Sequence, residues 1–542
     1  MALRIMLDNQ PEFYTNLDHV LGRVVLRLSR DEQVGSIVVK LEGEATTALQ
    51  VPSPYTPDAA RRPPAPMPGP PGSVVAETHK ILYRVQQVFP DDYHSSSSSP
   101  YGAFALQPGE HEFPFDFKLP INNACSDPMA MSRIGGLAGG GGLFGMGGVR
   151  VMDGSKQLFL KHVTRTLPPS LTGFPAEAEI RYYIKVTVQR PGLLRENWRL
   201  QTGFKFLPIE PPRPASTGQE TFARRPFTFR AKSPPPADKT RTSFFAPSPE
   251  KGAPGAADAS TPSIDVSARL PHPPVFTCNK PIPLRLIAKK LADCPDQVYL
   301  SSFQMDLVGV TEVRSHTIHH NRTNRWVVAA APNLSIPMTW SPQDEVGHEL
   351  VIPDDMWKNR PLPNTIAPSF VACNLSRRYE LEIRLGVSWG KPKTSFLGKD
   401  PFANAQTIFL PLRFAQVDVY SGITPPPELV QAAATRRPGS TILNIPPRLP
   451  PRASVPDLNS AARPQSQPQN QAPPQPPRPP TDPLYPPQLA PGQSAAPQDD
   501  APPSYDEAMA ENLSGPFDGA QARPAYSGVT NENAPSQMPE KS

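Results

Sequence analysis

Three histidines in the segment SHTIHHNR, His316, His319 and His320, form the closest group of side chains that could bind a metal ion. No carboxylate or cysteine stands beside them to complete a ligand set, and the surrounding alternation places them at a strand end or in a turn. The four cysteines, at positions 125, 278, 294 and 373, include no close-spaced pair. This spacing fits neither a disulfide framework nor a zinc site and is typical of a reducing compartment. We therefore expect no metal site.

No Ser/His/Asp or Cys/His combination stands in a catalytic motif, so the sequence predicts no catalytic residue, no cofactor and no enzyme. The glycine-rich stretch IGGLAGGGGLFGMGGV, from Ile134 to Val149, could be taken for a phosphate-binding loop. No Gly-Lys-Ser/Thr follows it and no helical pattern begins there, which favours a surface loop.

One segment near the C-terminus has the residue types of a peptide ligand. The stretch APPSYDEAMAE contains Pro502, Pro503 and Tyr505. A Pro-Pro-x-Tyr segment is preorganised as polyproline II, so little conformational entropy is lost on binding. WW domains hold such prolines between aromatic side chains, so these three residues are predicted to bind a WW domain. Tyr485, in DPLYPP, lacks the first proline and is a weak second site.

Cations gather in RYYIKVTVQRPGLLRENWR and just before it. The members are Lys161, Arg165, Arg181, Lys185, Arg190, Arg195 and Arg199. Two interpretations remain open: an ordinary solvated sheet face, or a basic patch that attracts acidic cytosolic tails of membrane transporters or anionic lipid head groups.

Three serines follow a basic residue by two or three positions, a spacing that suits a basophilic kinase: Ser233, Ser440 and Ser454. Ser233 also has a proline two positions later, as phosphoserine-binding adaptor proteins prefer. A phosphate there would add roughly −1.5 to −2 charge to a segment rich in Arg and Lys. We predict Ser233 as the first of these phosphorylation sites.

The composition indicates folded regions diluted by disordered ones, because 76 of the 542 residues are proline and only 38% are hydrophobic. The net charge of +5 is small for this length and argues against a nucleic-acid binder with a dominant basic field. The N-terminus, MALRIMLDNQ, has no signal-peptide pattern, and no apolar run is long enough to cross a bilayer, so any membrane role is expected to be peripheral.

Alternation of apolar and polar residues predicts half-buried antiparallel strands throughout both halves of the chain. In HEFPFDFKLP, the rings of Phe113, Phe115 and Phe117 fall on one face, and Pro114 restricts the strand to an edge or a bulge. No helical pattern of comparable strength lies between the strands. The predicted fold class is therefore all-β, with two tandem immunoglobulin-like sandwiches and a long disordered Pro-rich tail.

Composition divides the chain into four parts. The first sandwich is predicted over residues 1–210, with loop insertions near 50–75 and 125–155, and the second over 270–420. A disordered linker is predicted over 211–269 and a disordered tail over 421–542.

Several stretches resemble landmarks of the arrestin fold. LQPGEHEFPFDFKLP, NLDHVLGRVVLRL and LPPSLTGFPAEAEIRYYIKV resemble the N-terminal arrestin domain, and PIPLRLIAKK through DLVGVTEV resembles the opening of the C-terminal domain. Together with the Pro-Pro-x-Tyr tail, these stretches make the chain similar to the alpha-arrestins, the arrestin-related trafficking adaptors, of fungal type.

The resemblance implies an adaptor that recruits a HECT-class, WW-domain ubiquitin ligase to plasma-membrane transporters or receptors and so promotes their ubiquitination and endocytosis. It favours cytosolic tails as partners of the basic patch and phosphoserine-binding adaptor proteins as further partners. The implied location is the cytoplasm, with recruitment to the plasma membrane and endosomes. Two alternatives stay open: a signalling scaffold that binds a receptor tail, as in ambient-pH sensing, and a retromer-like trafficking subunit.

Overall fold

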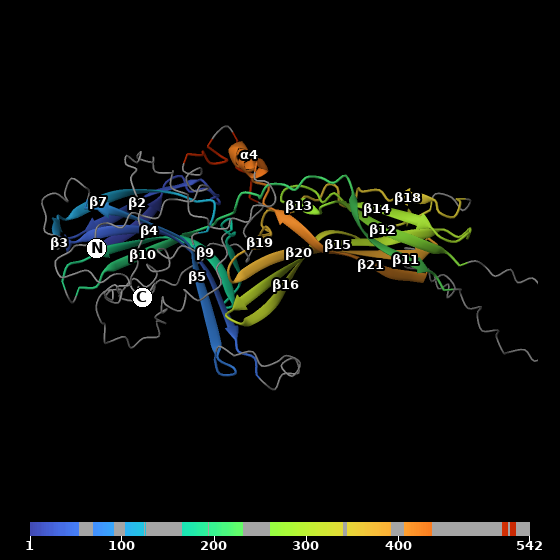
Figure 1. The fold of residues 1–542 in the computed structure, drawn as a ribbon, viewed down its shortest axis with the longest axis horizontal. Coiled ribbons are helices and arrows are strands. Elements are labelled where there is room, and N and C mark those ends of the chain that lie inside the picture. The colour runs from blue at the N-terminus through green and yellow to red at the C-terminus, as the bar shows by residue number, and fades with distance from the viewer. Residues whose placement is uncertain are drawn as a thin grey trace, which may run out of the picture.

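The computed structural model describes residues 1–53, 69–90, 103–123, 125, 165–192, 195–230, 261–339, 344–391, 406–435, 512–518 and 521–526. Within these residues the chain is built almost wholly of strands. They form two β-sandwiches that lie end to end (Figure 1).

The N-terminal sandwich contains β1 (Ala2–Leu7), β2 (His19–Leu28), β3 (Glu32–Val34), β4 (Ser36–Gln50), β5 (Val74–Phe89), β6 (Phe104–Leu106), β7 (Gly109–Lys118), β8 (Leu171–Phe174), β9 (Ala178–Gln189) and β10 (Trp198–Phe204). One sheet has the strand order β1-β2-β7 and the other β10-β9-β4-β5, with β8 paired to β9 and β3 paired to β6. Apolar side chains of both sheets pack into one core, as the alternation predicts.

The strand β7 has the predicted orientation. Phe115 and Phe117 are buried in the core, and Phe113 packs against it partly buried. β7 is the edge strand of its sheet, and Pro114 on it is exposed. The proline therefore sits where its missing N–H removes no ladder hydrogen bond from a central strand.

The C-terminal sandwich contains β11 (Glu220–Thr228), β12 (Ser263–Pro271), β13 (Val275–Thr277), β14 (Arg285–Lys290), β15 (Val298–Ser315), β16 (Ile318–Ala331), β17 (Ile336–Pro337), β18 (Glu349–Val351), β19 (Phe370–Val371), β20 (Leu375–Trp389) and β21 (Gln406–Tyr420). Its sheets have the orders β11-β12-β14-β18 and β13-β21-β20-β15-β16, with β17 on β15 and β19 on β20. The one parallel pair among the described strands is β13 with β21.

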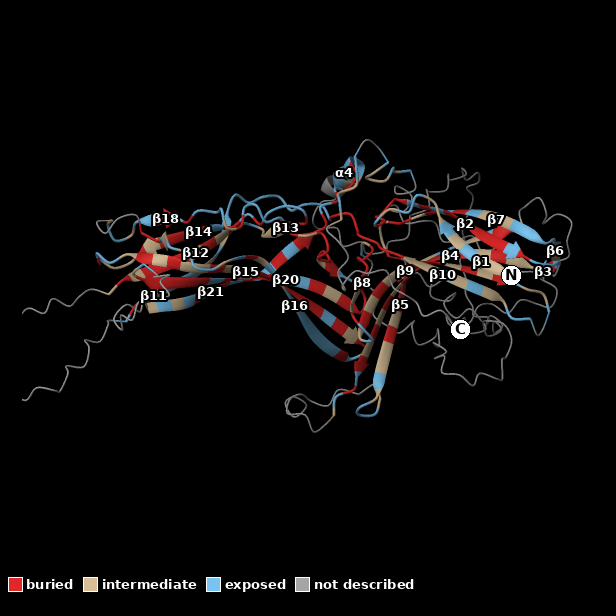
Figure 2. Cartoon of the chain, turned by 180° about the vertical axis from the view of Figure 1, so that it is seen from behind, coloured by how far each residue is buried: buried red, intermediate tan, exposed pale blue. Residues whose placement is uncertain are grey.

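The two sandwiches share apolar packing at their junction. Val313, Ile318, Phe370 and Leu375, all from the C-terminal half, belong to the core of the N-terminal sandwich. The ends of β15 and β16 reach this core beside β4 and β5, and buried segments continue from one sandwich into the other (Figure 2). The junction is therefore a packed interface, and this packing holds the side chains at the junction in place.

Order extends further than predicted into the linker and the tail. β11 lies inside the predicted linker and pairs along its whole length with β12, which also begins there. In the tail, the helix α4 (Pro427–Thr435) lies over the junction (Figure 1). Composition did not predict these elements, because a segment with few apolar residues can still form a strand or helix when those residues pack against a neighbouring surface. This helix is too short and too polar to cross a bilayer, and it is the one helix of the described residues.

Candidate functional site

The predicted basic residues do not form a single patch. Lys161 lies outside the described residues, and Arg165 is exposed ahead of β8. Arg181 contacts Glu44, with Nη2 to Oε2 at 2.8 Å. Beyond β9, Arg190 and Arg195 lie 3.3 and 3.7 Å from Oε2 of Glu32, so their charges are largely offset.

Two of the predicted cations, Lys185 and Arg199, remain without a carboxylate at ion-pair distance among the described residues. Lys185 lies opposite Lys40 in the β4–β9 register, on the outer face of the sheet. Burial lowers the pKa of Lys185, Glu42 opposes this, and the charges of Lys80, Lys40 and Arg199 lower it further. We call Lys40, Lys185 and Arg199 the outer cation cluster; like charges held together in this way attract an anionic partner.

A buried charge network lies next to this cluster. The ammonium group of Lys80 contacts Glu42 and lies 2.6 Å from Oε1 of Glu44. The hydroxyl of Tyr183 bonds to both carboxylates, at 2.7 and 2.8 Å. Burial raises the pKa of Glu44, but Lys80 and Arg181 outweigh it and hold that pKa at about 2. The Glu44 carboxylate is therefore ionised at neutral pH, and it is bonded to Lys80, Arg181 and Tyr183.

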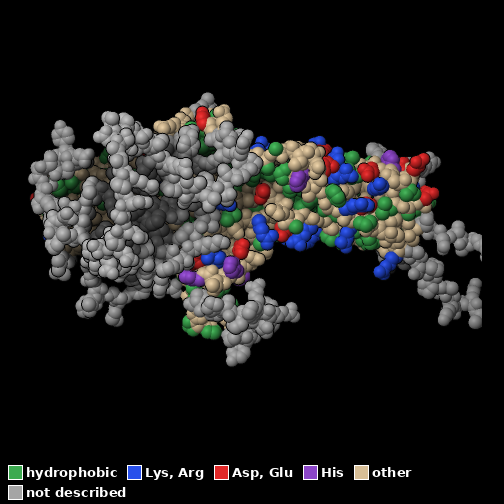
Figure 3. Space-filling view, in the orientation of Figure 1, with side chains coloured by type: hydrophobic (Ala, Val, Ile, Leu, Met, Phe, Trp, Pro, Cys, Tyr) green, Lys and Arg blue, Asp and Glu red, His purple; other side chains and the backbone are tan. Residues whose placement is uncertain are grey.

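The C-terminal sandwich presents charges of both signs instead. On the face seen in Figure 3, Lys and Arg alternate with Asp and Glu over this sandwich. A groove across β11, β12 and β14 is lined by paired charges, including Arg269 with Glu220 at 3.5 Å and Lys289 with Glu349 at 3.9 Å. Such a groove has no dominant sign with which to select a charged partner.

Glu77 anchors the junction between the sandwiches. Its carboxylate, from β5, is fully buried and accepts a hydrogen bond from Arg314 at 2.8 Å and another from the backbone N–H of His316. Burial raises the pKa of Glu77, but bonds from His79 and His316 and the charge of Arg314 lower it overall. Asn374 adds a bond from the C-terminal half to the Ala45 carbonyl, at 3.0 Å. The junction therefore depends on buried polar contacts as well as on apolar packing.

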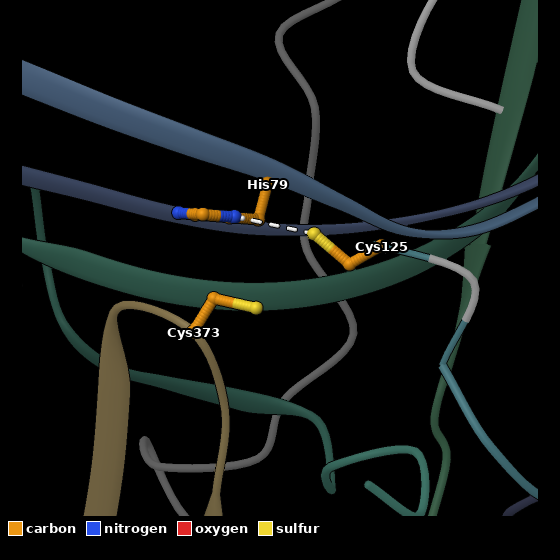
Figure 4. A group of neighbouring side chains, drawn as sticks. All are labelled: His79, Cys125 and Cys373. Carbon is orange, nitrogen blue, oxygen red and sulfur yellow. Dashed lines mark hydrogen bonds between the residues drawn. The ribbon is translucent and has the colours of Figure 1, made fainter. Parts of the chain in front are cut away.

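Beside Glu77, three side chains that sequence spacing did not connect come together: His79 from β5, Cys125 after β7, and Cys373 between β19 and β20 (Figure 4). All three are buried, and Nδ1 of His79 lies 3.2 Å from Sγ of Cys125. The hydrogen bond between Cys125 and Cys373, followed by burial, raises the pKa of the Cys125 thiol. The cysteines of the described residues form no disulfide.

The three histidines of SHTIHHNR lie where predicted, at the turn from β15 to β16. They diverge: His319 contacts Glu312 at 3.2 Å, His320 contacts Glu177 at 3.1 Å, and both are about half exposed. His316 has a positive φ of 54° in the turn. They do not converge on one point, so among the described residues this segment is a surface turn.

A segment close to the C-terminus docks on the N-terminal sandwich. The guanidinium of Arg523 donates to the Phe13 carbonyl and to buried Asp18, both at 2.9 Å. Its plane also covers the ring of Phe517, 4.7 Å from the centroid. Burial raises the pKa of Asp18, and the bond from Arg523 opposes that rise.

Further contacts hold the same segment. Tyr526 packs on Phe13 with ring centroids 5.9 Å apart, and the ammonium of Lys205 lies 4.0 Å from the Tyr526 ring centroid. Lys118 donates to the Leu513 carbonyl at 2.6 Å. The predicted WW ligand, Pro502, Pro503 and Tyr505, lies outside the described residues, as do Ser233, Ser440 and Ser454. These sites stay predictions.

Comparison with known proteins identifies the fold. Residues 3–136 match the family described as Arrestin (or S-antigen), N-terminal domain. A stretch of 127 residues is 25% identical to a protein of Lachancea thermotolerans (strain ATCC 56472 / CBS 6340 / NRRL Y-8284) named Arrestin-related trafficking adapter 10. The N-terminal part of the chain is therefore similar to arrestin N-terminal domains and to this adapter. The match covers 23% of this chain and 28% of the length of that relative.

Proposed function

We propose that this chain is an alpha-arrestin, a trafficking adaptor that recruits a HECT-class ubiquitin ligase to plasma-membrane transporters or receptors. The main support is that an arrestin fold and a Pro-Pro-x-Tyr segment occur in one chain. In addition, a relative is named as a trafficking adapter. In this role the molecule acts by binding rather than by catalysis. It works in the cytoplasm and at the plasma membrane and endosomes.

The docked C-terminal segment supports a close approach of ligase and cargo. Asn512 follows Tyr505 by seven positions and belongs to that segment. Seven extended residues span at most about 25 Å. A ligase bound at Tyr505 would therefore stay near the N-terminal sandwich, where the outer cation cluster can receive an acidic cytosolic tail.

Affinity purification of the wild-type chain beside Tyr505→Ala, with partners identified by mass spectrometry, tests the proposal. We expect Tyr505→Ala to lose one ligase and to retain cargo, because the motif lies far in sequence from the sandwiches. Tyr485→Ala, in the weaker site of the same tail, is the matched control and should keep the ligase. An unchanged partner set would contradict the adaptor role. Retention of a receptor tail with no ligase in either sample would favour the signalling scaffold.

A peptide from Asp500 to Ala510 allows a direct measurement of the affinity of the Pro-Pro-x-Tyr segment for a WW domain. We expect it to bind an isolated WW domain with a free energy on the order of −7 to −8 kcal/mol. The same peptide with Tyr505→Ala should not bind. Absence of heat for the natural peptide in calorimetry would remove the ligase link.

A further inference from the structure

The cluster of His79, Cys125 and Cys373 has the donor set of a zinc site. Their ligand atoms, one nitrogen and two sulfurs, all lie within 4.8 Å of one another. Zinc takes Cys sulfur at about 2.3 Å and His nitrogen at about 2.0–2.1 Å, which separates neighbouring ligand atoms by roughly 3.5–3.8 Å in a tetrahedron. The observed spacing therefore needs only small side-chain adjustments. Figure 4 shows the three side chains converging from separate segments.

A second contact orients the imidazole. Oε1 of Glu77 lies 2.6 Å from Nε2 of His79, so Nε2–H donates to the carboxylate and Nδ1 is left with its lone pair toward the sulfurs. Histidines that bind zinc usually donate their other N–H to a carboxylate or carbonyl in this way. Arg314 fixes Glu77 in turn, at 2.8 Å.

The charges also balance. Binding Zn²⁺ to two thiols releases two protons, and two thiolates with one Zn²⁺ are neutral. Glu77 and Arg314 form a second neutral pair beside them. A site with no net charge suits the buried junction, where an uncompensated ion would be strongly unfavourable.

We propose that His79 Nδ1, Cys125 Sγ and Cys373 Sγ bind one Zn²⁺ ion, with a water molecule in the fourth position. Cys125 and His79 belong to the N-terminal sandwich and Cys373 to the C-terminal one. The ion therefore joins the two sandwiches at the junction. The site binds zinc in a reducing compartment, where the two thiols stay unoxidised.

Metal analysis of the full chain tests this site. Protein purified under reducing conditions without chelator, and equilibrated with stoichiometric Zn²⁺, should hold about one zinc per chain. Cys125→Ser and Cys373→Ser should reduce this at least tenfold. Cys278→Ser and Cys294→Ser replace buried cysteines outside the cluster and should leave the zinc content unchanged.

Two further measurements on the wild type do not depend on whether the variants fold. X-ray absorption at the zinc edge should give two sulfur ligands, with nitrogen or oxygen completing the shell. Replacement of zinc by Co²⁺ should give the thiolate charge-transfer band and the strong visible bands of a tetrahedral site. Wild-type protein that binds no zinc, a shell without sulfur, or a Cys125–Cys373 disulfide in freshly purified reduced protein would overturn the proposal.

Discussion

The charge network of the N-terminal sandwich and the groove of the C-terminal sandwich use charged residues in different ways. In the N-terminal sandwich and at its junction, Glu42, Lys80 and Glu77 are buried and Glu44 is partly buried, and all four are bonded to one another or to Arg314. In the groove of the C-terminal sandwich, the ion pairs that Glu220 and Glu349 make with Arg269 and Lys289 are partly exposed. Buried charges destabilise strongly when one partner is removed, whereas exposed pairs contribute about 0–1 kcal/mol. Substitutions in the N-terminal network and at Glu77 should therefore destabilise the chain more than substitutions of the ion pairs in the groove.

The largest expected difference concerns two phenylalanines. Phe115→Asp should unfold the N-terminal sandwich, because it buries an unpaired charge in a core where Phe115 is only 4% exposed. Phe222→Asp, on β11 of the other half, should leave the fold intact because that ring is 64% exposed. Circular dichroism and thermal unfolding of both variants check this. A soluble Phe115→Asp protein with an unchanged transition would refute the assigned orientation of β7.

Two ion pairs across the junction allow a matched test. Arg314 reaches buried Glu77, whereas Arg322 reaches Glu177 at 2.8 Å with its side chain 46% exposed. Arg314→Ala should destabilise the chain by about 3–5 kcal/mol, since it leaves the Glu77 carboxylate without its cation. Arg322→Ala should change stability by about 0–1 kcal/mol. Denaturant titration measures both, and equal losses would mean that burial does not distinguish the two pairs.

The charge network predicts an acid-sensitive N-terminal half. Glu44 has an ordinary pKa of 4.5 and a folded pKa of about 2, so its contribution is present above pH 4.5 and is lost as the pH falls toward 2. Glu44→Gln should lower stability at neutral pH, by on the order of 3 kcal/mol, and flatten the curve in that range. Glu349→Gln, at a partly exposed pair in the groove, is the matched control and should change stability at neutral pH by about 0–1 kcal/mol. Thermal melts between pH 2 and 7 compare them, and parallel curves for wild type and Glu44→Gln would contradict the assignment.

Alternation within short stretches of sequence predicted the strands, but it could not predict contacts between residues that are distant in sequence. The core rings of β7 follow from alternation alone, because a period of two is written in neighbouring residues. Glu77 and Arg314 are separated by 237 positions, and His79 and Cys125 by 46. Only the pairing of strands and the junction bring them together. The basic patch was predicted too large for the same reason. Glu32 and Glu44, which pair with its arginines, lie far from them in sequence.

The smallest expected change in stability concerns the C-terminal segment that docks on the N-terminal sandwich. Arg523 is 30% exposed but reaches Asp18, which is 3% exposed, so the contact lies between the buried and exposed classes. Arg523→Ala should release residues 512–518 and 521–526 at a local free-energy change of about 1–3 kcal/mol, because it leaves the buried Asp18 carboxylate without its cation. The global melting transition should not move, since the segment contributes few apolar contacts to either main core. Hydrogen exchange should rise in this segment alone, whereas Arg269→Ala in the groove should leave it protected. Unchanged exchange in Arg523→Ala would mean that Tyr526 and Leu513 hold the segment without the ion pair.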